Sequence, residues 1–103
     1  MGKTKVINKD IFERNAGIYK LMANGKRLEI LDLLGTREMT VTELVNAMKI
    51  RKANVSQHLA LLRYLRFVKV KRVGKNAFYS LADPKITKSF QIMNDLLKNN
   101  RFS

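Results

Sequence analysis

Apolar residues recur at helical spacing over most of the chain, but their period falls to two between residues 68 and 81. The helical pattern predicts helices over residues 10–23, 25–34, 40–48, 52–65 and 84–99. The alternating segment contains a turn around Gly74 and therefore predicts a β-hairpin. These segments together predict a mainly α-helical fold with one small hairpin.

Local signals mark where several of these helices begin and end. Asn24 can cap the helix that starts at residue 25, and Gly35 is expected to end it in the left-handed conformation. Thr40 and Glu43 have the spacing of a capping box, in which each side chain accepts a hydrogen bond from the other residue's backbone amide. Pro84 suits the first turn of the last helix.

The first and last helices carry more apolar surface than a single small core requires. The first helix has two separate apolar lines, and the last has a stripe at spacings of i, i+4, i+7 and i+11. A partner chain would cover this excess. We therefore predict a dimer interface formed by Ile11, Phe12, Ile18, Met22, Ile86, Phe90, Met93 and Leu97.

The two helices between residues 40 and 65 have contrasting faces. Val55, Leu59 and Leu62 follow the i, i+4, i+7 rule and are expected to face inward. The opposite line is small and polar and holds no acid: Ala53, Ser56, Gln57 and Ala60. Two short helices joined by a tight turn, the second with such a face, form the pattern of a helix-turn-helix.

The distribution of charge supports the prediction of a helix-turn-helix that binds nucleic acid. The chain has 21 Lys and Arg against 8 Asp and Glu, which gives a net charge of +13. Residues 51–80 carry eight of the basic groups, and no carboxylate occurs between Glu43 and Asp83. Such a local excess points to a polyanionic partner, most often a nucleic acid. A solvated basic face usually has acids interspersed, so that alternative is less favoured.

Size and composition exclude several other classes of protein. A chain of 103 residues forms one small domain, and its longest uncharged stretch, 53–62, is too short to cross a membrane. No signal-peptide pattern is present, so we expect a cytoplasmic protein that associates with the nucleoid when bound to DNA. The chain has no cysteine, which excludes disulfides and thiol chemistry. No phosphate-binding glycine loop and no nucleophile–base set is visible, so an enzyme is not expected.

Three segments, at 24–31, 42–44 and 54–62, together with the hairpin at 68–81, resemble the ArsR/SmtB family of small dimeric winged helix-turn-helix repressors. The run Val55-Ser56-Gln57-His58-Leu59 followed by the hairpin is the most specific part of the likeness. The resemblance implies a homodimer that is joined by the first and last helices and binds an inverted-repeat operator. It also implies that an inducer, often a metal ion, releases the DNA.

The pattern of the residues, together with the resemblance, divides the chain. Residues 1–9 would be a basic N-terminal tail, and residues 10–103 a winged helix-turn-helix domain. Within that domain we expect the helix-turn-helix at about 40–65, the hairpin or wing at about 67–81, and the C-terminal dimerisation helix at about 84–99.

The family's metal sites lack most of their ligands in this chain. One site uses two cysteines at positions that Val45 and Ala47 occupy here. The other uses an Asp-x-His pair and two later ligands, of which only Asp83 remains, because Leu96 and Asn99 stand at the later positions. Zinc-like ions need three or four imidazole, thiolate or carboxylate ligands, and the chain has a single histidine. We expect no metal site and no cofactor, and the inducer is unknown.

The candidate DNA-binding residues lie on the second of the two helices and on the hairpin. Gln57 can bind adenine through two hydrogen bonds, and Lys52 can donate to guanine. His58 either contacts DNA or packs locally, and the hairpin lysines could instead protect an edge strand. Phe78 and Tyr79 could stack on bases but are more often core residues. The full set is Arg51, Lys52, Asn54, Ser56, Gln57, His58, Arg63, Lys69, Lys71, Arg72 and Lys75.

The function that the sequence favours is a sequence-specific regulator of transcription that binds double-stranded DNA, acting as a homodimeric repressor without the usual metal sites. The alternative is a winged-helix architectural protein that binds DNA or RNA with little sequence specificity.

Overall fold

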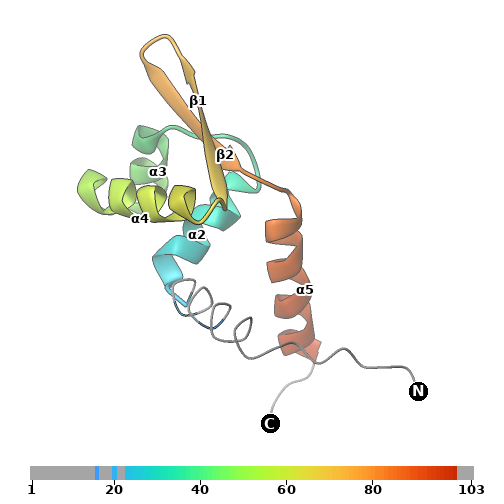
Figure 1. Cartoon of the computed structure of the whole chain (residues 1–103). Coiled ribbons are helices and arrows are strands. Elements are labelled where there is room, and N and C mark those ends of the chain that lie inside the picture. The colour runs from blue at the N-terminus through green and yellow to red at the C-terminus, as the bar shows by residue number, and fades with distance from the viewer. Residues whose placement is uncertain (1–15, 17–19, 21–22, 100–103) are drawn as a thin grey trace.

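The computed structural model of the chain describes residues 16, 20 and 23–99, except for the side chains at positions 90, 93, 94 and 96–99. Within residues 23–99, three helices come first, then an antiparallel hairpin, then a last helix (Figure 1). The elements are α2 (Gly25–Leu34), α3 (Val41–Met48), α4 (Lys52–Tyr64), β1 (Val68–Val73), β2 (Asn76–Leu81) and α5 (Lys85–Asn99). The predicted mainly α-helical fold with one hairpin is confirmed.

Part of the prediction lies outside the described residues. This holds for the basic tail at 1–9 and for most of the predicted helix at 10–23, of which residues 16 and 20 are described and helical. Ile11, Phe12, Ile18 and Met22 therefore stay predictions, as do the interface roles of Phe90, Met93 and Leu97. Among the described helices, none has the length and apolar character needed to cross a membrane.

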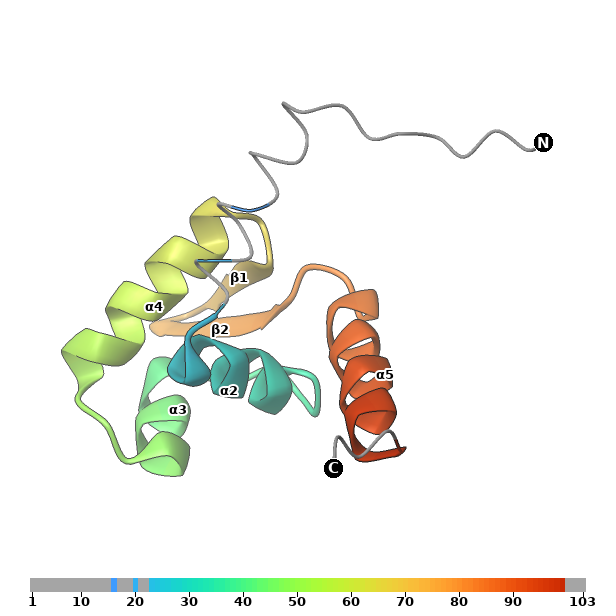
Figure 2. The ribbon, with the colours of Figure 1, turned by 90° about the horizontal axis from the view of Figure 1, so that it is seen from below.

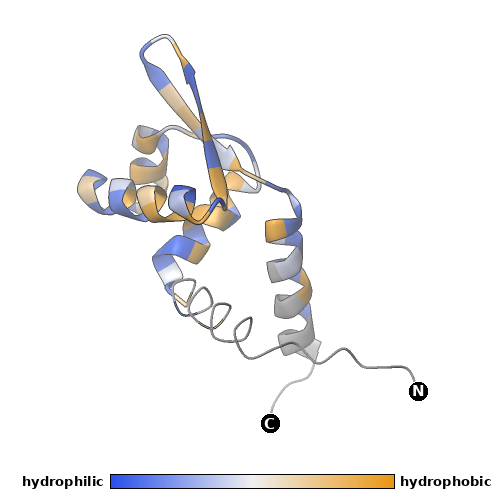
Figure 3. Ribbon diagram, viewed as in Figure 1, coloured by the Kyte–Doolittle hydropathy of each residue, from blue (hydrophilic) through white to orange (hydrophobic). Residues whose placement is uncertain are grey.

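The core lies where α2, α3 and α4 meet beneath the hairpin. Each of the three helices contributes buried aliphatic residues, and Met39 and Val68 close the core from the loop before α3 and from β1. Val55, Leu59 and Leu62 are buried, as their spacing predicted. Hydrophobic and hydrophilic residues alternate along the hairpin (Figure 3), which is the period-two pattern of a half-exposed strand.

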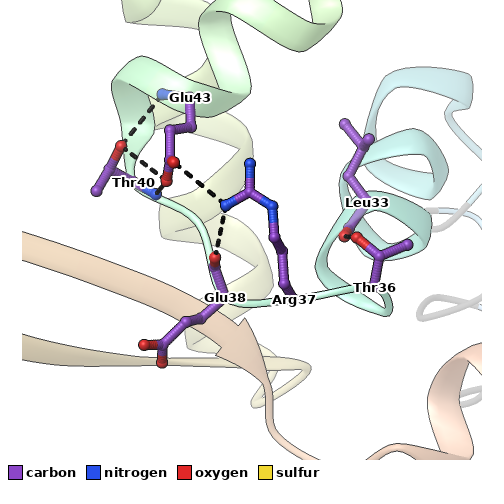
Figure 4. A network of polar contacts seen from close by, with 6 residues as sticks. All are labelled: Leu33, Thr36, Arg37, Glu38, Thr40 and Glu43. Carbon is purple, nitrogen blue, oxygen red and sulfur yellow. Dashed lines mark hydrogen bonds and ion pairs between the residues drawn. The ribbon is translucent and has the colours of Figure 1, made fainter.

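The predicted N-terminal caps of α2 and α3 are both present. The Asn24 side-chain oxygen accepts hydrogen bonds from the amides of Lys26 and Arg27 at 3.0 and 3.1 Å. The Glu43 amide donates to the Thr40 hydroxyl at 3.1 Å, and the Thr40 amide donates to the Glu43 carboxylate at 2.9 Å (Figure 4). The amide of Thr40, followed by the Arg37 side chain, lowers the pKa of Glu43. Local sequence therefore fixes where these helices start.

The predicted end of α2 is wrong in its conformation. Gly35 has φ −67, an ordinary right-handed helical value, and its amide donates to the Leu31 oxygen at 2.9 Å. Glycine is required there because of packing against α5: an added Cβ would lie 2.6 Å from the Thr87 methyl carbon and 3.2 Å from the Asp32 oxygen. The residue therefore permits close contact between two helices.

The hairpin is joined to the helical body by a pairing that the sequence pattern did not reveal. Val73 and Asn76 pair across a two-residue turn in which Gly74 has φ +62. At the other end, Met39 pairs with Tyr79 through two hydrogen bonds: the Met39 amide donates to the Tyr79 oxygen at 2.9 Å, and the reverse bond is 2.8 Å. This pairing anchors β2 to the loop before α3.

The last helix stands apart from α3 and α4, with α2 between (Figures 1 and 2). Asp83 accepts a hydrogen bond from the Lys85 amide at 2.9 Å at the start of α5, beside Pro84. Ile86 is half-buried against the core of its own chain. Near its start, α5 also contacts α2 through Thr87 and Gly35.

We expect Gly35→Ala to destabilise the fold by about 1–3 kcal/mol, because the new methyl would overlap the rigid Thr87 side chain. Gly25→Ala is the matched control, since a Cβ there meets nothing within 4 Å. Urea unfolding of both variants is the measurement. Adding Thr87→Ala to Gly35→Ala should recover part of the stability. Equal stability of the two glycine variants would contradict the close contact.

Candidate nucleic-acid interface

The orientation of α4 leaves one face of the helix toward solvent. Because Val55, Leu59 and Leu62 are buried, the opposite face is exposed over its whole length. That face carries the predicted base-reading residues, since Lys52, Asn54, Ser56 and Gln57 are all exposed. Ala53 and Ala60 are exposed as well, and such small side chains allow close approach of another surface.

A sharp turn sets α4 against α3. Lys49 ends α3 in the left-handed conformation, with φ 60, and its amide donates to the Val45 oxygen at 2.8 Å. The chain then continues through an extended Arg51 into α4. The predicted helix-turn-helix geometry is thus present between residues 41 and 64.

The start of α4 differs from the starts of α2 and α3 in its electrostatics. Arg51 occupies the N-cap position without a side-chain hydrogen bond to the helix, and the first turn contains no acid. Arg51 and Lys52 are both exposed cations at the positive end of the helix dipole. A phosphate at this end would accept hydrogen bonds from the first amides and offset the repulsion.

The hairpin carries four exposed cations. Lys69 and Lys71 share one face of β1, while Arg72 projects from the other, since successive side chains on a strand alternate. Lys75 lies in the turn at the tip. Figure 1 shows that the hairpin extends beyond the helices, which places these cations on a projecting arm.

One carboxylate approaches the hairpin from outside the acid-free stretch of sequence. Glu38 lies 3.6 Å from the Lys71 ammonium, and both side chains are largely exposed. An exposed pair of this kind contributes about 0–1 kcal/mol, so Lys71 can exchange Glu38 for another anion. Sequence reasoning missed the pair because Glu38 precedes α3.

His58 lies apart from the other candidates. It is half-buried on the α4 flank near Arg27 of α2, and burial, followed by the Arg27 charge, lowers its pKa. The lowered pKa favours the neutral imidazole. Its position favours local packing over phosphate contact.

An open groove separates α4 from β2. Its volume is about 460 Å³, and we call it the α4–β2 groove. It is lined by Ser56, Leu59, Ala60, Arg63, Tyr64 and Tyr79. Tyr64 is 82% exposed and was missed by sequence reasoning, although it continues the line of Ala53, Gln57 and Ala60 at helical spacing. Tyr79 is half-buried against the core, as expected.

The positions of the family's metal ligands hold other groups in this structure. Val45 is half-buried and Ala47 exposed on α3, and Asp83 accepts the hydrogen bond from the Lys85 amide. Among the described residues, no three His, Cys, Asp or Glu side chains gather into a group that could hold a metal ion.

A packed helix-turn-helix followed by a projecting two-stranded hairpin defines this chain as a winged helix-turn-helix protein. The family model for bacterial regulatory proteins of the arsR family matches residues 24–70. A transcriptional repressor from Synechocystis sp., described as an SmtB homologue, is 33% identical over 96 residues, which cover 93% of this chain and 73% of that protein. The chain therefore belongs to the ArsR family.

Two further similar proteins are also regulators or DNA-binding domains with this fold. The transcriptional activator HlyU of Vibrio cholerae is 32% identical over 79 residues, which are 77% of this chain and 73% of HlyU. Its structure superposes with a TM-score of 0.73, covering 86% of this chain and 97% of that one at 28% identity. A homodimeric winged helix-turn-helix DNA-binding domain from Mycobacterium bovis gives a TM-score of 0.78 at 25% identity, covering 98% and 94% of the two chains. The chain is a transcriptional regulator and not an enzyme.

Arg51→Ser should affect stability and DNA binding in opposite directions. A serine at the N-cap would accept a hydrogen bond from the start of α4 and stabilise the fold by about 1 kcal/mol. Removal of the cation should weaken binding to duplex DNA. Thr40→Ala is the matched control, because it removes a cap from α3 and should cost about 1 kcal/mol of stability without weakening binding by the folded protein. Urea unfolding and fluorescence anisotropy measure the two effects, and an increase in both for Arg51→Ser would contradict the phosphate role.

Proposed function

We propose that the protein is a homodimeric repressor that binds a specific inverted-repeat sequence in double-stranded DNA. The observation that carries the proposal is the exposed face of α4, which begins at an uncapped, cationic helix end and contains no acid. The repressor assignment follows the Synechocystis relative, and the homodimer follows the M. bovis neighbour. Such a protein would act in the cytoplasm, on the nucleoid.

The polar residues of the first two turns of α4 would read bases in the major groove. Gln57 can bind the edge of adenine through two hydrogen bonds, and Lys52 can donate to guanine. Asn54 and Ser56 stand beside them on the exposed surface. Because Ala53 adds no bulk, the helix backbone can approach the base edges closely.

The remaining cations would contact the DNA backbone. Arg51 lies at the start of α4 and Arg63 near its end, so the two can reach phosphates on either side of the major groove. Lys69, Lys71, Arg72 and Lys75 of the wing would follow the backbone or enter the adjacent minor groove. His58 would support α4 from the side of α2.

A dimer would place two copies of α4 in successive major grooves, about 34 Å apart along the duplex. The predicted interface residues of the first and last helices would join the protomers. In this arrangement the two-fold symmetry of the protein matches the inverted repeat of the operator.

The test is a comparison of base-reading and phosphate-contacting variants on two duplexes, one selected from a random pool by the wild-type protein and one scrambled. Gln57→Ala should cost roughly 1–3 kcal/mol on the selected duplex and leave binding to the scrambled one nearly unchanged. Arg72→Ala or Lys75→Ala should weaken both about equally. Each of these two should also lower the slope of log affinity against log salt by about one unit for every phosphate that the variant no longer neutralises.

Salt titration of each variant on both duplexes provides the measurement, and Lys88→Ala on the exposed surface of α5 is the control. If Gln57→Ala loses the same affinity on both duplexes, sequence-specific binding is wrong. An architectural role with little sequence preference would then be the better description.

Zinc, nickel, cobalt and arsenite should leave the protein–DNA complex intact. The chain has no cysteine and one histidine, so a set of three or four strong ligands is not available from these residue types. Anisotropy with and without each ion measures release of DNA. A tight, stoichiometric zinc site found by calorimetry in the tag-free protein, coupled to release, would contradict this expectation.

A further inference from the structure

The α4–β2 groove lies between the two parts of the chain that are proposed to contact DNA. Of the described residues that line it, five come from α4 and one, Tyr79, comes from β2. Ser56 links the groove to the base-reading surface, and Arg63 extends it toward the end of the helix. A DNA strand that passes from α4 to the wing must cross this groove.

Tyr64 forms one side of the groove and has no role in the core. It is 82% exposed and follows Val55 by nine residues, which places it on the opposite side of α4, about 180° around the helix axis. Tyrosine side chains are among the groups that donate to phosphates in protein–DNA complexes, and this one is accessible on the surface proposed to face DNA. Its hydroxyl can donate a hydrogen bond at the far end of the ring.

Tyr79 forms a fixed wall on the other side. Its backbone is hydrogen-bonded to Met39 in both directions, at 2.9 and 2.8 Å, and it also pairs with Val70 of β1. The side chain is half-buried against the core. The distance between the wing and the body is therefore set at this residue.

The chemistry of the groove suits a sugar–phosphate backbone. Among the described residues that line it, the hydrogen-bonding groups are the hydroxyls of Ser56, Tyr64 and Tyr79 and the guanidinium of Arg63, and none is a carboxylate. Hydroxyls and a guanidinium are common phosphate donors in protein–DNA complexes. Ala60 is small, and the aromatic ring of the exposed Tyr64 offers apolar surface to a deoxyribose.

We propose that the α4–β2 groove binds the DNA backbone between the major groove read by α4 and the minor groove next to the wing. Tyr64 and Arg63 donate to one phosphate in each half-site, and Tyr79 supports the adjoining sugar. This inference rests on the proposed DNA-binding function and adds two tyrosines to its contact surface.

Four variants test the groove in the full chain: Tyr64→Ala, Tyr64→Phe, Arg63→Gln and the surface control Lys88→Gln. Tyr64→Phe removes one hydroxyl from each protomer and should weaken binding to both the selected and the scrambled duplex about tenfold, which is the reduction expected when two phosphate hydrogen bonds are lost. Tyr64→Ala removes the same two hydroxyls together with the rings, so it should weaken binding at least as much. Arg63→Gln should also lower the salt slope by about one unit for each phosphate left without its guanidinium, whereas a phenol adds no charge and its variants should keep the slope. Lys88→Gln should keep both affinity and slope.

Duplexes with single neutral methylphosphonate linkages locate the phosphate. For the wild-type protein, one methylphosphonate linkage per half-site should reduce the binding affinity more than the neighbouring linkages do. At that linkage Tyr64→Phe and Arg63→Gln should reduce the affinity little further, because the hydrogen bonds they remove are already absent. At the remaining linkages the two reductions should multiply. Thermal unfolding checks that each variant is as folded as the wild type.

The outcomes separate this inference from the proposed function. If the wild-type protein binds a selected duplex specifically while both Tyr64 variants bind like the wild type, the groove assignment is wrong and the function stands. A second outcome is that the wild type binds all duplexes alike, while the Tyr64 variants still weaken binding and lose their effect at one methylphosphonate linkage. The groove assignment then stands, and sequence-specific regulation is wrong. If the loss of affinity in the Tyr64 variants multiplies with the loss caused by each methylphosphonate linkage, without exception, Tyr64 binds no phosphate and the inference is overturned.

Discussion

The rotation of α4 about its own axis is the constraint on which the rest of this structure depends. Val55, Leu59 and Leu62 are buried against α2 and α3, so turning the helix over would expose all three at a cost on the order of 5 kcal/mol. That penalty holds the opposite face toward solvent. The exposed residues are therefore free to be selected for what they bind, and Gln57 can change without disturbing the core.

The three helices of the body are stabilised at their starts by different means. Asn24 and the pair of Thr40 and Glu43 cap α2 and α3 with their own side chains. In α4, Arg51 stands where a cap would be, and the helix begins with positive charge near its positive dipole end. Two helices are thus capped by side chains of the protein, whereas the third begins uncapped and cationic. Under the proposed function, Arg51 would strengthen DNA binding at the position where it reduces stability.

Features set by residues close together in the sequence could be predicted, whereas features set by residues far apart could not. The capping box and the inward line of α4 involve residues a few positions apart, and both were predicted correctly. Gly35 was misinterpreted because its constraint is Thr87, which belongs to α5. The pairing of Met39 with Tyr79 and the approach of Glu38 to Lys71 are also long-range, and no local pattern encodes them. Tyr64 follows Ala60 by four residues and lies on the same exposed line, but a pattern of small and polar side chains ends at Ala60.

The contact between Gly35 and Thr87 holds α5 near its start. Thr87 is the third residue of a helix that continues to Asn99, so about 18 Å of helix extends beyond the contact. A tilt of α5 by about 10° about this contact would shift its far end by roughly 3 Å, whereas residues close to the contact would hardly move. Small changes of angle near the start of α5 are thereby converted into large displacements at its other end.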